Sequence, residues 1–310
     1  INKFHSTFID SIQRFVHKGR IHAEINQLRS DQGGTVSGRL SMSNPNLQQI
    51  PARNKEYGDK IRSLFLPEEG RQWGSFDYSQ QEPRLVAHYS ASIDETFSGA
   101  QEFIEAYQNE SADFHQIVAD MASISRTQAK TINLGLFYGM GKAKLSRELG
   151  ISKDAAESLL NKYHTRVPFV KKLAESVMSS ASKYGFIRTI KGRRCRFDMW
   201  EPATFGMNKA MNYEEAKAIY GNNIRRAFTY KALNRLIQGS AADQTKQAMI
   251  ECVKNGFNPI LQIHDELCFS INEESDIIKV KELMENAIEG LKVPSKVDTA
   301  IGRSWGEAKE

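Results

Sequence analysis

The sequence predicts an α+β fold in which a block of helices is inserted between the parts of a β-sheet. Short apolar segments of strand length lie at 72–78 and 259–271. Between them, the stretch 111–182 has a mostly helical pattern, broken by Gly and Pro. Strands at both ends with helices between them are typical of an α+β domain that holds a helical insertion. The length of 310 residues allows one large domain or two modest ones.

Each further element follows from a local pattern. Phe4, Phe8 and Ile12 stand four residues apart and predict an amphipathic helix near the start of the chain. Lys191 and Gly192, between β-branched residues, predict the turn of a hairpin. In chain order we expect a helix over 4–15, a loop over 30–46, a helix over 82–92, a hairpin over 184–197, a basic helical region to 254, a strand–turn–strand unit over 259–271, a helix over 275–291 and a short tail.

The composition excludes several classes of protein. With 40% hydrophobic and 25% charged residues, the chain is an ordinary globular one rather than a disordered or fibrous one. No run approaches the roughly 18–20 apolar residues of a membrane helix, and the charged first twenty residues do not form a signal peptide. Cys195, Cys252 and Cys268 form no CxxC pair, so we expect reduced thiols and a cytoplasmic location.

The distribution of charge is more informative than the net charge of +5. Three runs, 121–147, 183–196 and 217–235, contain five, six and five Lys or Arg and no acid. One such run is equally typical of a solvated helix face. Three of them in one chain favour binding to phosphate groups.

Two acidic segments could bind a metal ion. Asp77 follows an apolar strand, where an unpaired carboxylate is costly unless it faces a cation, although an Asp at a helix start is also common. Asp265 and Glu266 lie between two apolar segments and would suit Mg²⁺, although a solvated hairpin turn also explains them. The sequence spacing alone does not bring the two segments together. If they meet, a two-metal site for phosphoryl transfer would result.

Glu82 has two structural interpretations. Ser79 and Glu82 fit a capping box, with Ser79 at the N-cap. Alternatively, Pro83 occupies the first helical position, where its missing N–H costs nothing, and Glu82 is then available for another role.

A stripe of residues at a spacing of four follows in the helical block. Arg126, Lys130, Leu134 and Tyr138 would share one face of a helix, with two cations followed by an apolar and an aromatic side chain. Such a face could hold a nucleoside triphosphate, because Arg and Lys bind phosphate oxygens. A basic surface helix that touches the core with Leu and Tyr would show the same spacing.

Taken together, these segments resemble the polymerase domain of family A DNA polymerases, the bacterial DNA polymerase I type. The resemblance spans 37–266 and runs in family order. It is carried by SGRLSMSNPNLQQIP (37–51), DYSQQEPR (77–84, similar to motif A), RTQAKTINLGLFYG (126–139, motif B), KYGFIRTIKGRR (183–194), KALNRLIQGSAAD (231–243) and QIHDE (262–266, motif C).

The resemblance implies a role for each matched residue. Asp77 and Asp265 would bind two Mg²⁺ ions, for which Mn²⁺ could substitute, with Glu266 in the same site. Lys130 would also act as a general acid toward pyrophosphate. The implied nucleotide-binding residues are Arg126, Lys130, Leu134, Tyr138, Glu82 and His115, with Glu82 excluding a ribose 2′-hydroxyl. The implied contacts to primer–template DNA are Arg39, Asn234, Gln238 and His264.

The implied architecture is an antiparallel-sheet palm with a large helical fingers subdomain inserted and the thumb mostly absent. We expect the end of a thumb over 1–36, palm over 37–91, fingers over 92–224 and palm again over 225–310. The implied function is template-directed DNA synthesis from dNTPs on primer–template DNA, without a membrane and without an exonuclease domain. A separate chain would supply the missing thumb or exonuclease. A metal-dependent nuclease or a catalytically weak nucleic-acid-binding remnant are the alternatives.

The chain departs from the family pattern at a few positions. Leu134 stands where Phe or Tyr is usual, so we expect that dideoxynucleotides are discriminated against, which primer extension with mixed nucleotides would test. Gln81 and Pro83 replace the usual Ile and Leu, a variant associated with phage-type members. For a phage-encoded chain, this resemblance implies the host cytoplasm as the location. The segment 207–223 matches nothing in the family and is expected to be an insertion.

Overall fold

The computed structural model describes residues 5–31, 33–51, 57–93, 104–105, 107, 113–137, 140–204 and 209–308. The contacts divide the chain into two compact units. Unit 1 contains residues 1–81, 241–291 and 295–310, and unit 2 contains residues 82–240 and 292–294. Each unit is described by itself below. In the described part of the chain, no helix is both long and apolar enough to cross a membrane.

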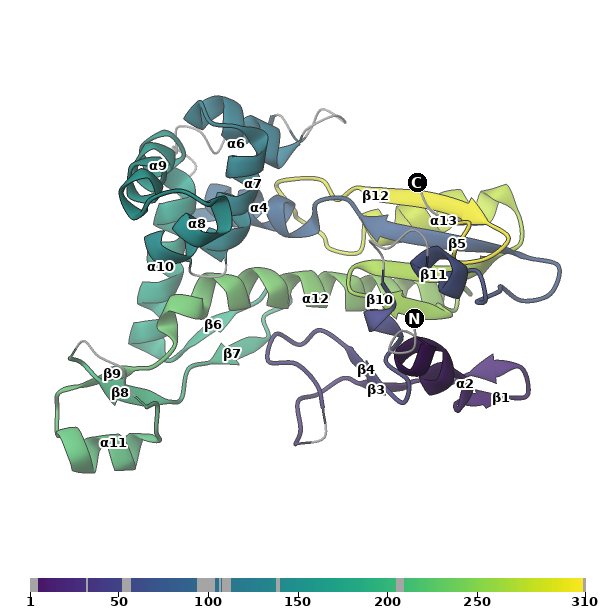
Figure 1. Cartoon of the computed structure of the whole chain (residues 1–310), viewed down its shortest axis with the longest axis horizontal. Helices are drawn as coiled ribbons and strands as arrows, with labels where there is room; N and C mark the ends of the chain where they lie inside the picture. Colours follow the sequence, from purple (N-terminus) through teal and green to yellow (C-terminus); the bar gives the residue numbers. More distant parts are fainter. Residues whose placement is uncertain are drawn as a thin grey trace. The chain divides into compact units, whose positions relative to one another are not determined.

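A four-stranded antiparallel sheet forms the centre of unit 1 (Figure 1). Its order is β10-β11-β5-β12, with β5 (Gln72–Tyr78) between β11 (Glu266–Ile271) and β12 (Val297–Gly302). The strand β10 (Leu261–Ile263) lies at one edge. Strands that are almost two hundred residues apart in the sequence are therefore direct neighbours in the sheet.

Alternating side chains of this sheet enter two separate cores. On one face, Phe76 and Phe269 pack in a T-shaped contact against residues of the helices α12 (Ala232–Lys254) and α13 (Glu274–Glu285). On the other face, Trp73 stacks on the fully buried Trp305. Because side chains alternate along a strand, Asp77 belongs to the Trp73 face, opposite α12 and α13.

Short elements before β5 cover the Trp73 face. Met42, Leu47, Ile50 and Ile61 are the buried residues that these elements contribute. In chain order the elements are η1 (His5–Asp10), α2 (Ser11–Gln13), β1 (Val16–His17), β2 (Arg20–Ile21), β3 (Glu24–Asn26), β4 (Ser41–Ser43), η2 (Leu47–Gln49) and α3 (Gly58–Arg62).

Unit 2 is mainly helical (Figure 1). Ser152 caps α9 by accepting a hydrogen bond from the Ala155 N–H, and Pro168 begins α10, where a missing N–H is harmless. Gly185 ends α10 in the left-handed conformation that glycine adopts readily. The helices are α4 (Gln81–Ile93), α6 (Phe114–Ala122), α7 (Arg126–Phe137), α8 (Lys142–Leu149), α9 (Lys153–Arg166) and α10 (Pro168–Tyr184).

Two small hairpins follow α10 in unit 2. The first pairs β6 (Phe186–Arg188) with β7 (Arg194–Arg196), and the second pairs β8 (Trp200–Pro202) with β9 (Ile224–Arg226). Helix α11 (Tyr213–Tyr220) lies between β8 and β9 in sequence. The segment 207–223, which was expected to be an insertion, therefore contains this helix. Residues 207 and 208 lie outside the described residues. A 3₁₀ turn, η3 (Thr229–Lys231), leads into α12.

Most of the predicted elements are confirmed, including the strand over 72–78, the helix after it and the hairpin over 184–197. Three predictions are wrong. The expected loop over 30–46 contains β4, which pairs with β3, and the expected helical region before 254 contains β8 and β9. The expected tail forms β12. The strands β4, β8 and β9 have three residues each and no strong alternation, so their pairing partners stabilise them, whereas β12 has six residues and was overlooked.

Candidate active site

Three carboxylates lie in one row across the central sheet of unit 1. The Cα of Asp77 on β5 is paired with Glu266 on β11 and with Asp298 on β12. Directly opposed residues project from the same face, with Cβ atoms about 4.5–5.5 Å apart. Like charges at that spacing destabilise a sheet, so the row is costly unless a cation is present.

Asp265 joins this row from the turn between β10 and β11. The register pairs Ile263 with Glu266, which leaves only His264 and Asp265 in the turn. His264 has a φ of +55°, a conformation that is uncommon for a residue other than glycine. The Gln262 amide donates to the His264 carbonyl and accepts from Gln48, so two glutamines fix this turn.

The site concentrates negative charge. Asp77 is partly exposed to solvent at the pocket, but the surrounding protein removes enough water to raise its pKa to about 8. The negative charge of Asp265 is the next largest cause of that rise. Burial likewise raises the pKa of Asp265, which the positive charge of Arg39 partly opposes. Both shifts have burial as their largest cause, and the neighbouring carboxylates add to them.

Glu266 is held by a chain of polar contacts on the same face. The buried Cys268 thiol donates to its carboxylate at 3.4 Å, and the Ser75 hydroxyl lies 3.7 Å from that thiol. Burial raises the pKa of Cys268, which keeps the thiol protonated and able to donate. Trp73 donates in turn to Ser75.

The carboxylates open into a pocket of about 370 Å³. Arg62, Asp77, Asp265, Glu266 and Asp298 are among its lining residues. Among the residues that the structure describes, no three His, Cys, Asp or Glu side chains form a group that could hold a metal ion. Mg²⁺ usually keeps several waters and binds through one or two carboxylates together with substrate phosphates. The hard oxygen ligands of this pocket therefore fit such an ion.

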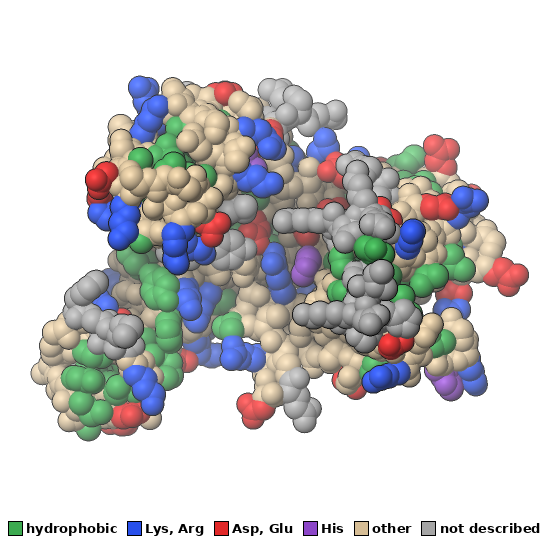
Figure 2. Space-filling view, in the orientation of Figure 1, with side chains coloured by type: hydrophobic (Ala, Val, Ile, Leu, Met, Phe, Trp, Pro, Cys, Tyr) green, Lys and Arg blue, Asp and Glu red, His purple; other side chains and the backbone are tan. Residues whose placement is uncertain are grey.

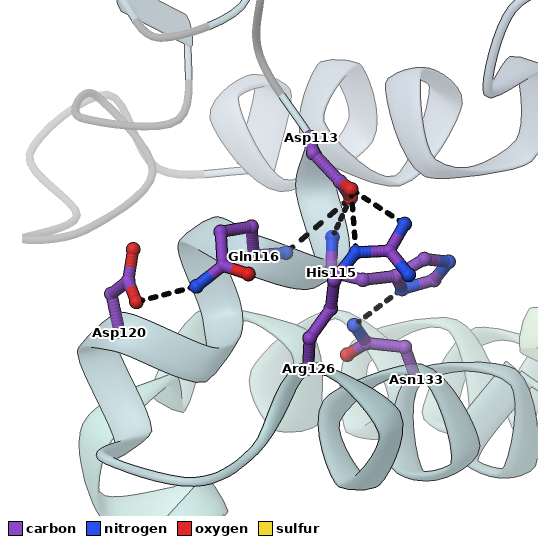
Figure 3. A network of polar contacts seen from close by, with 6 residues as sticks. All are labelled: Asp113, His115, Gln116, Asp120, Arg126 and Asn133. Carbon is purple, nitrogen blue, oxygen red and sulfur yellow. Dashed lines mark hydrogen bonds and ion pairs between the residues drawn. The ribbon is translucent and has the colours of Figure 1, made fainter.

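The predicted basic stripe lies on α7 in unit 2. Arg126 and Lys130 are exposed one turn apart, while Ile132 and Asn133 are buried. Arg126 forms an ion pair with Asp113 at 2.6 Å (Figure 3). Asp113 is also the N-cap of α6, because its carboxylate accepts from the backbone N–H groups of His115 and Gln116. One acid thus anchors both a helix start and the first cation of the stripe.

His115 lies beside this ion pair and has a defined tautomer (Figure 3). The Tyr163 hydroxyl donates to Asn133 Oδ1 at 2.6 Å, so the Asn133 amide nitrogen faces His115 Nδ1 at 3.1 Å. That nitrogen can only donate, so Nδ1 accepts and the proton of neutral His115 resides on Nε2. Burial lowers the pKa of His115, and the charge of Lys130 adds to this effect.

Comparisons with known proteins identify the family of this chain. The model of DNA polymerase family A matches residues 1–307. The chain belongs to DNA polymerase family A. A DNA-directed DNA polymerase of Pseudomonas phage M6 is 38% identical over 99% of this chain and 50% of the relative, and the thermostable DNA polymerase I of Thermus filiformis is 35% identical over 100% of this chain and 35% of the relative.

A solved family A structure has the same fold. The POL domain of Pol1 from M. smegmatis, in complex with DNA primer-template and dNTP, superposes with a TM-score of 0.78 at 33% identity, covering 99% of this chain and 52% of that one. The α+β fold predicted from the sequence is therefore confirmed. This chain spans half or less of the length of the two curated relatives described above.

The family A chain places the other predicted residues as follows. In unit 1, His264 is exposed at the turn and Arg39 is near enough to Asp265 to influence its pKa. In unit 2, Glu82 is half-buried in the first turn of α4, and Asn234 and Gln238 lie one turn apart on α12. The backbone of Leu134 belongs to α7, whereas Tyr138 lies outside the described residues.

The two unusual residues of motif A have a structural explanation. The Gln81 amide nitrogen is buried and lies within 3.3 Å of three acceptors on α12, the Ala241 carbonyl, Gln244 and Thr245. A buried polar side chain is tolerated when it is bonded in this way. Pro83 lies in the first turn of α4, which begins at Gln81 rather than at either predicted start.

Sequence reasoning missed several residues of the site. Asp298 was assigned to the tail, although Val297, Thr299 and Ile301 alternate as in a strand. The sequence gives no indication that Asn133 and Tyr163 belong to the site, because their hydrogen bond joins two different helices, α7 and α9. Gln262 was part of a recognised motif, but only its bond to the turn indicates what it does.

Proposed function

We propose that this chain is the catalytic part of a template-directed DNA polymerase, which adds deoxynucleotides to a primer 3′-hydroxyl. The observation that carries the proposal is the convergence of Asp77, Asp265 and Glu266 in one pocket. These residues are far apart in sequence and come from the two family motifs that contain the acids. Membership of family A supports the same activity.

The pocket carboxylates would hold the metal ions. Asp77 and Asp265 are the proposed ligands of two Mg²⁺ ions, and Glu266 lies in the same pocket. When bound, such ions stabilise the attacking and leaving oxygens of an in-line phosphoryl transfer. The raised pKa of Asp77 supports this assignment, because a nearby cation would favour its charged form.

The face of α7 would bind the incoming nucleotide. Lys130 offers a point charge to the triphosphate and is the proposed general acid toward pyrophosphate. Arg126 can form a forked pair with phosphate oxygens once it exchanges Asp113 for them. His115 adds a neutral Nε2–H donor. Glu82, Leu134 and Tyr138 are the proposed lining of the sugar pocket.

Family membership supports a proposal for the remaining parts. Arg39, Asn234, Gln238 and His264 are proposed to contact the primer–template, as the solved relative's complex with DNA supports. We further propose that the sheet of unit 1 is the palm and the helices of unit 2 the fingers. Contacts to phosphates would be independent of DNA sequence and sensitive to salt.

Primer extension with Mg²⁺ and dNTPs tests the proposal directly. We expect Asp77→Ala and Asp265→Ala each to abolish extension, whereas Asp154→Ala, an exposed acid of α9, should extend primers at the wild-type rate. Mn²⁺ binding measured by electron paramagnetic resonance should fall in the first two variants only. Unchanged extension and unchanged Mn²⁺ binding in both would contradict the metal assignment.

Two further readouts separate the alternatives. Degradation of the primer in the absence of dNTPs, lost in Asp77→Ala, would favour a nuclease instead. Glu82→Ala should raise the use of ribonucleotides, and an unchanged ratio of ribonucleotide to deoxynucleotide incorporation would remove Glu82 from the sugar pocket.

A further inference from the structure

The carboxylate of Glu266 is held by a thiol rather than by a cation. Ion pairs are common elsewhere in the chain: Glu68 bonds to Arg20 at 2.6 Å, and several acidic side chains in Figure 2 lie beside Lys or Arg. In the part of the chain that the structure describes, Glu266 forms no ion pair. Arg62 lines the same pocket, but its guanidinium donates to the Ile50 carbonyl at 3.3 Å.

Four side chains form a directed chain of hydrogen bonds that ends on Glu266. The Trp73 indole N–H can only donate, and it donates to the Ser75 hydroxyl at 3.3 Å. The Cys268 thiol has a single proton, which it donates to Glu266 Oε1 at 3.4 Å. Ser75 is therefore the donor in its 3.7 Å contact with the Cys268 sulfur. Every proton in the chain points toward the carboxylate, and hydrogen bonds aligned in this way polarise one another.

The register of the central sheet brings these side chains together. Ser75 on β5 is directly opposite Cys268 on β11. Two positions further along the same strands, Asp77 is directly opposite Glu266. Side chains at alternate positions share a face of the sheet, so Trp73 and Ser75 project from the same side of β5 as Asp77. The hydrogen-bond chain thus lies directly behind the carboxylates of the pocket.

The hydrogen-bond chain begins in the core and ends at the pocket. Trp73 is buried and stacks on Trp305, with ring planes 18° apart. Cys268 is fully buried, whereas Glu266 is half-buried and lines the pocket. Buried polar groups keep the hydrogen-bond partners that the fold gives them, because no water is present to replace those partners. The contact therefore fixes Oε1 of Glu266 and leaves Oε2 available to the pocket.

We propose that Cys268 is a positioning residue of the polymerase site, which acts through Glu266. Its thiol is a weak, uncharged donor, so it orients the carboxylate without neutralising it, as Lys or Arg would. The second oxygen of Glu266 then remains available to water bound to a metal ion, since Mg²⁺ usually keeps several waters. The inference rests on the proposed function and extends it to a residue behind the three carboxylates.

Mn²⁺ binding measured by electron paramagnetic resonance tests this role without requiring activity. Cys268→Ala removes the donor and should weaken Mn²⁺ binding about 10-fold, the lower end of the range for groups that orient metal ligands. Cys268→Ser keeps a donor and should recover most of that affinity. Cys252→Ala is the matched control and should bind Mn²⁺ as wild type, because Cys252 is an equally buried thiol in the core on the opposite face of the sheet.

The infrared S–H stretching band of Cys268 reports its hydrogen bond in the wild-type protein. The component that is lost in both Cys268→Ala and Cys268→Ser identifies this band. Bonds to charged acceptors are the stronger ones, so the band should move to higher frequency when Mg²⁺ attracts the charge of the carboxylate. Glu266→Gln, which has a neutral acceptor, should shift the band in the same direction without a metal ion.

Several results would overturn the proposal. They are an Mn²⁺ affinity of Cys268→Ala equal to that of Cys252→Ala, equal losses in Cys268→Ala and Cys268→Ser, or a Cys268 band that Mg²⁺ does not move. Asp77→Ala separates this inference from the proposed function. If Asp77→Ala loses Mn²⁺ binding and Cys268→Ala keeps it, the metal assignment stands and only the role of Cys268 is wrong. If Asp77→Ala binds Mn²⁺ as wild type, the metal assignment fails and this inference fails with it.

Discussion

Tyr163→Phe is the sharpest test of the hydrogen bonds that orient His115. The Tyr163 hydroxyl and the Asn133 side chain are both fully buried and share a 2.6 Å hydrogen bond. Removing the hydroxyl leaves the Asn133 carbonyl oxygen without a donor in a dry environment. An unsatisfied buried acceptor costs about 1–3 kcal/mol. We therefore expect this variant to lose that much local stability in α7 and α9.

Hydrogen–deuterium exchange of α7 and α9 measures this loss. At constant intrinsic rate, about 1–3 kcal/mol corresponds to exchange that is roughly 5- to 150-fold faster. Tyr184→Phe is the matched control, because that hydroxyl is exposed, and its exchange should match wild type within about 0.5 kcal/mol.

The tautomer of His115 provides a second readout. In the wild type, ¹⁵N NMR should report a proton on Nε2 and none on Nδ1. In Tyr163→Phe the Asn133 amide is free to rotate, so both tautomers should be present. Unchanged exchange together with an unchanged tautomer would refute the account of how His115 is oriented.

Three further predictions test other parts of the molecule. The pKa of Asp77 is raised from 3.8 to about 8 on folding, so its ionisation destabilises the folded chain as pH rises through that window. In EDTA, the wild type should therefore lose thermal stability relative to Asp77→Asn between about pH 5 and 8. Parallel plots of melting temperature against pH for the two proteins would contradict this. Asp113→Ala should lower the stability of α6 by about 0.5–2 kcal/mol, because it removes the N-cap. Asp113→Asn keeps the cap but not the charge and should lower the stability by less than about 1 kcal/mol. Urea unfolding measures both losses. Gly58→Ala places a Cβ 2.0 Å from the Pro51 carbonyl oxygen and should cost about 1–3 kcal/mol. Gly141→Ala has open space around it and should cost less than about 1 kcal/mol, the loss expected for Ala at the N-cap of α8. Thermal melting measures both.

The sequence was sufficient to predict the elements whose pattern is local. The strand over 72–78 has a buried apolar run and the hairpin at Lys191–Gly192 has its own turn, so both could be predicted before any contact was known. The acids of motifs A and C could be identified from their residue types next to apolar segments. Their proximity was predicted only from the resemblance to the family, because the sequence spacing does not indicate it. Asp298 was missed although the residues around it alternate as in a strand, and only the pairing of β12 with β5 shows that it lies beside Asp77.

The same reasoning explains the error over residues 198–226. Each strand there has three residues and no alternation that would distinguish it from a loop. Contacts between the two strands, such as Arg226 over the Trp200 ring, contribute to their stability. The Tyr163–Asn133–His115 contacts are likewise tertiary, joining α6, α7 and α9. A sequence pattern within one segment cannot indicate hydrogen bonds that join three different helices.

The register of the central sheet has a consequence for biosynthesis. Asp77 is paired with Glu266 and Asp298, which follow it by 189 and 221 residues. At about 5–20 residues per second, a ribosome needs roughly 9–38 s to translate the first of these intervals. During this time the nascent β5 has neither neighbour, and an apolar strand with two open edges is prone to pair with other chains. Expression at lower temperature or with a chaperone that shields such segments should therefore raise the yield of folded protein more than any change at the catalytic pocket.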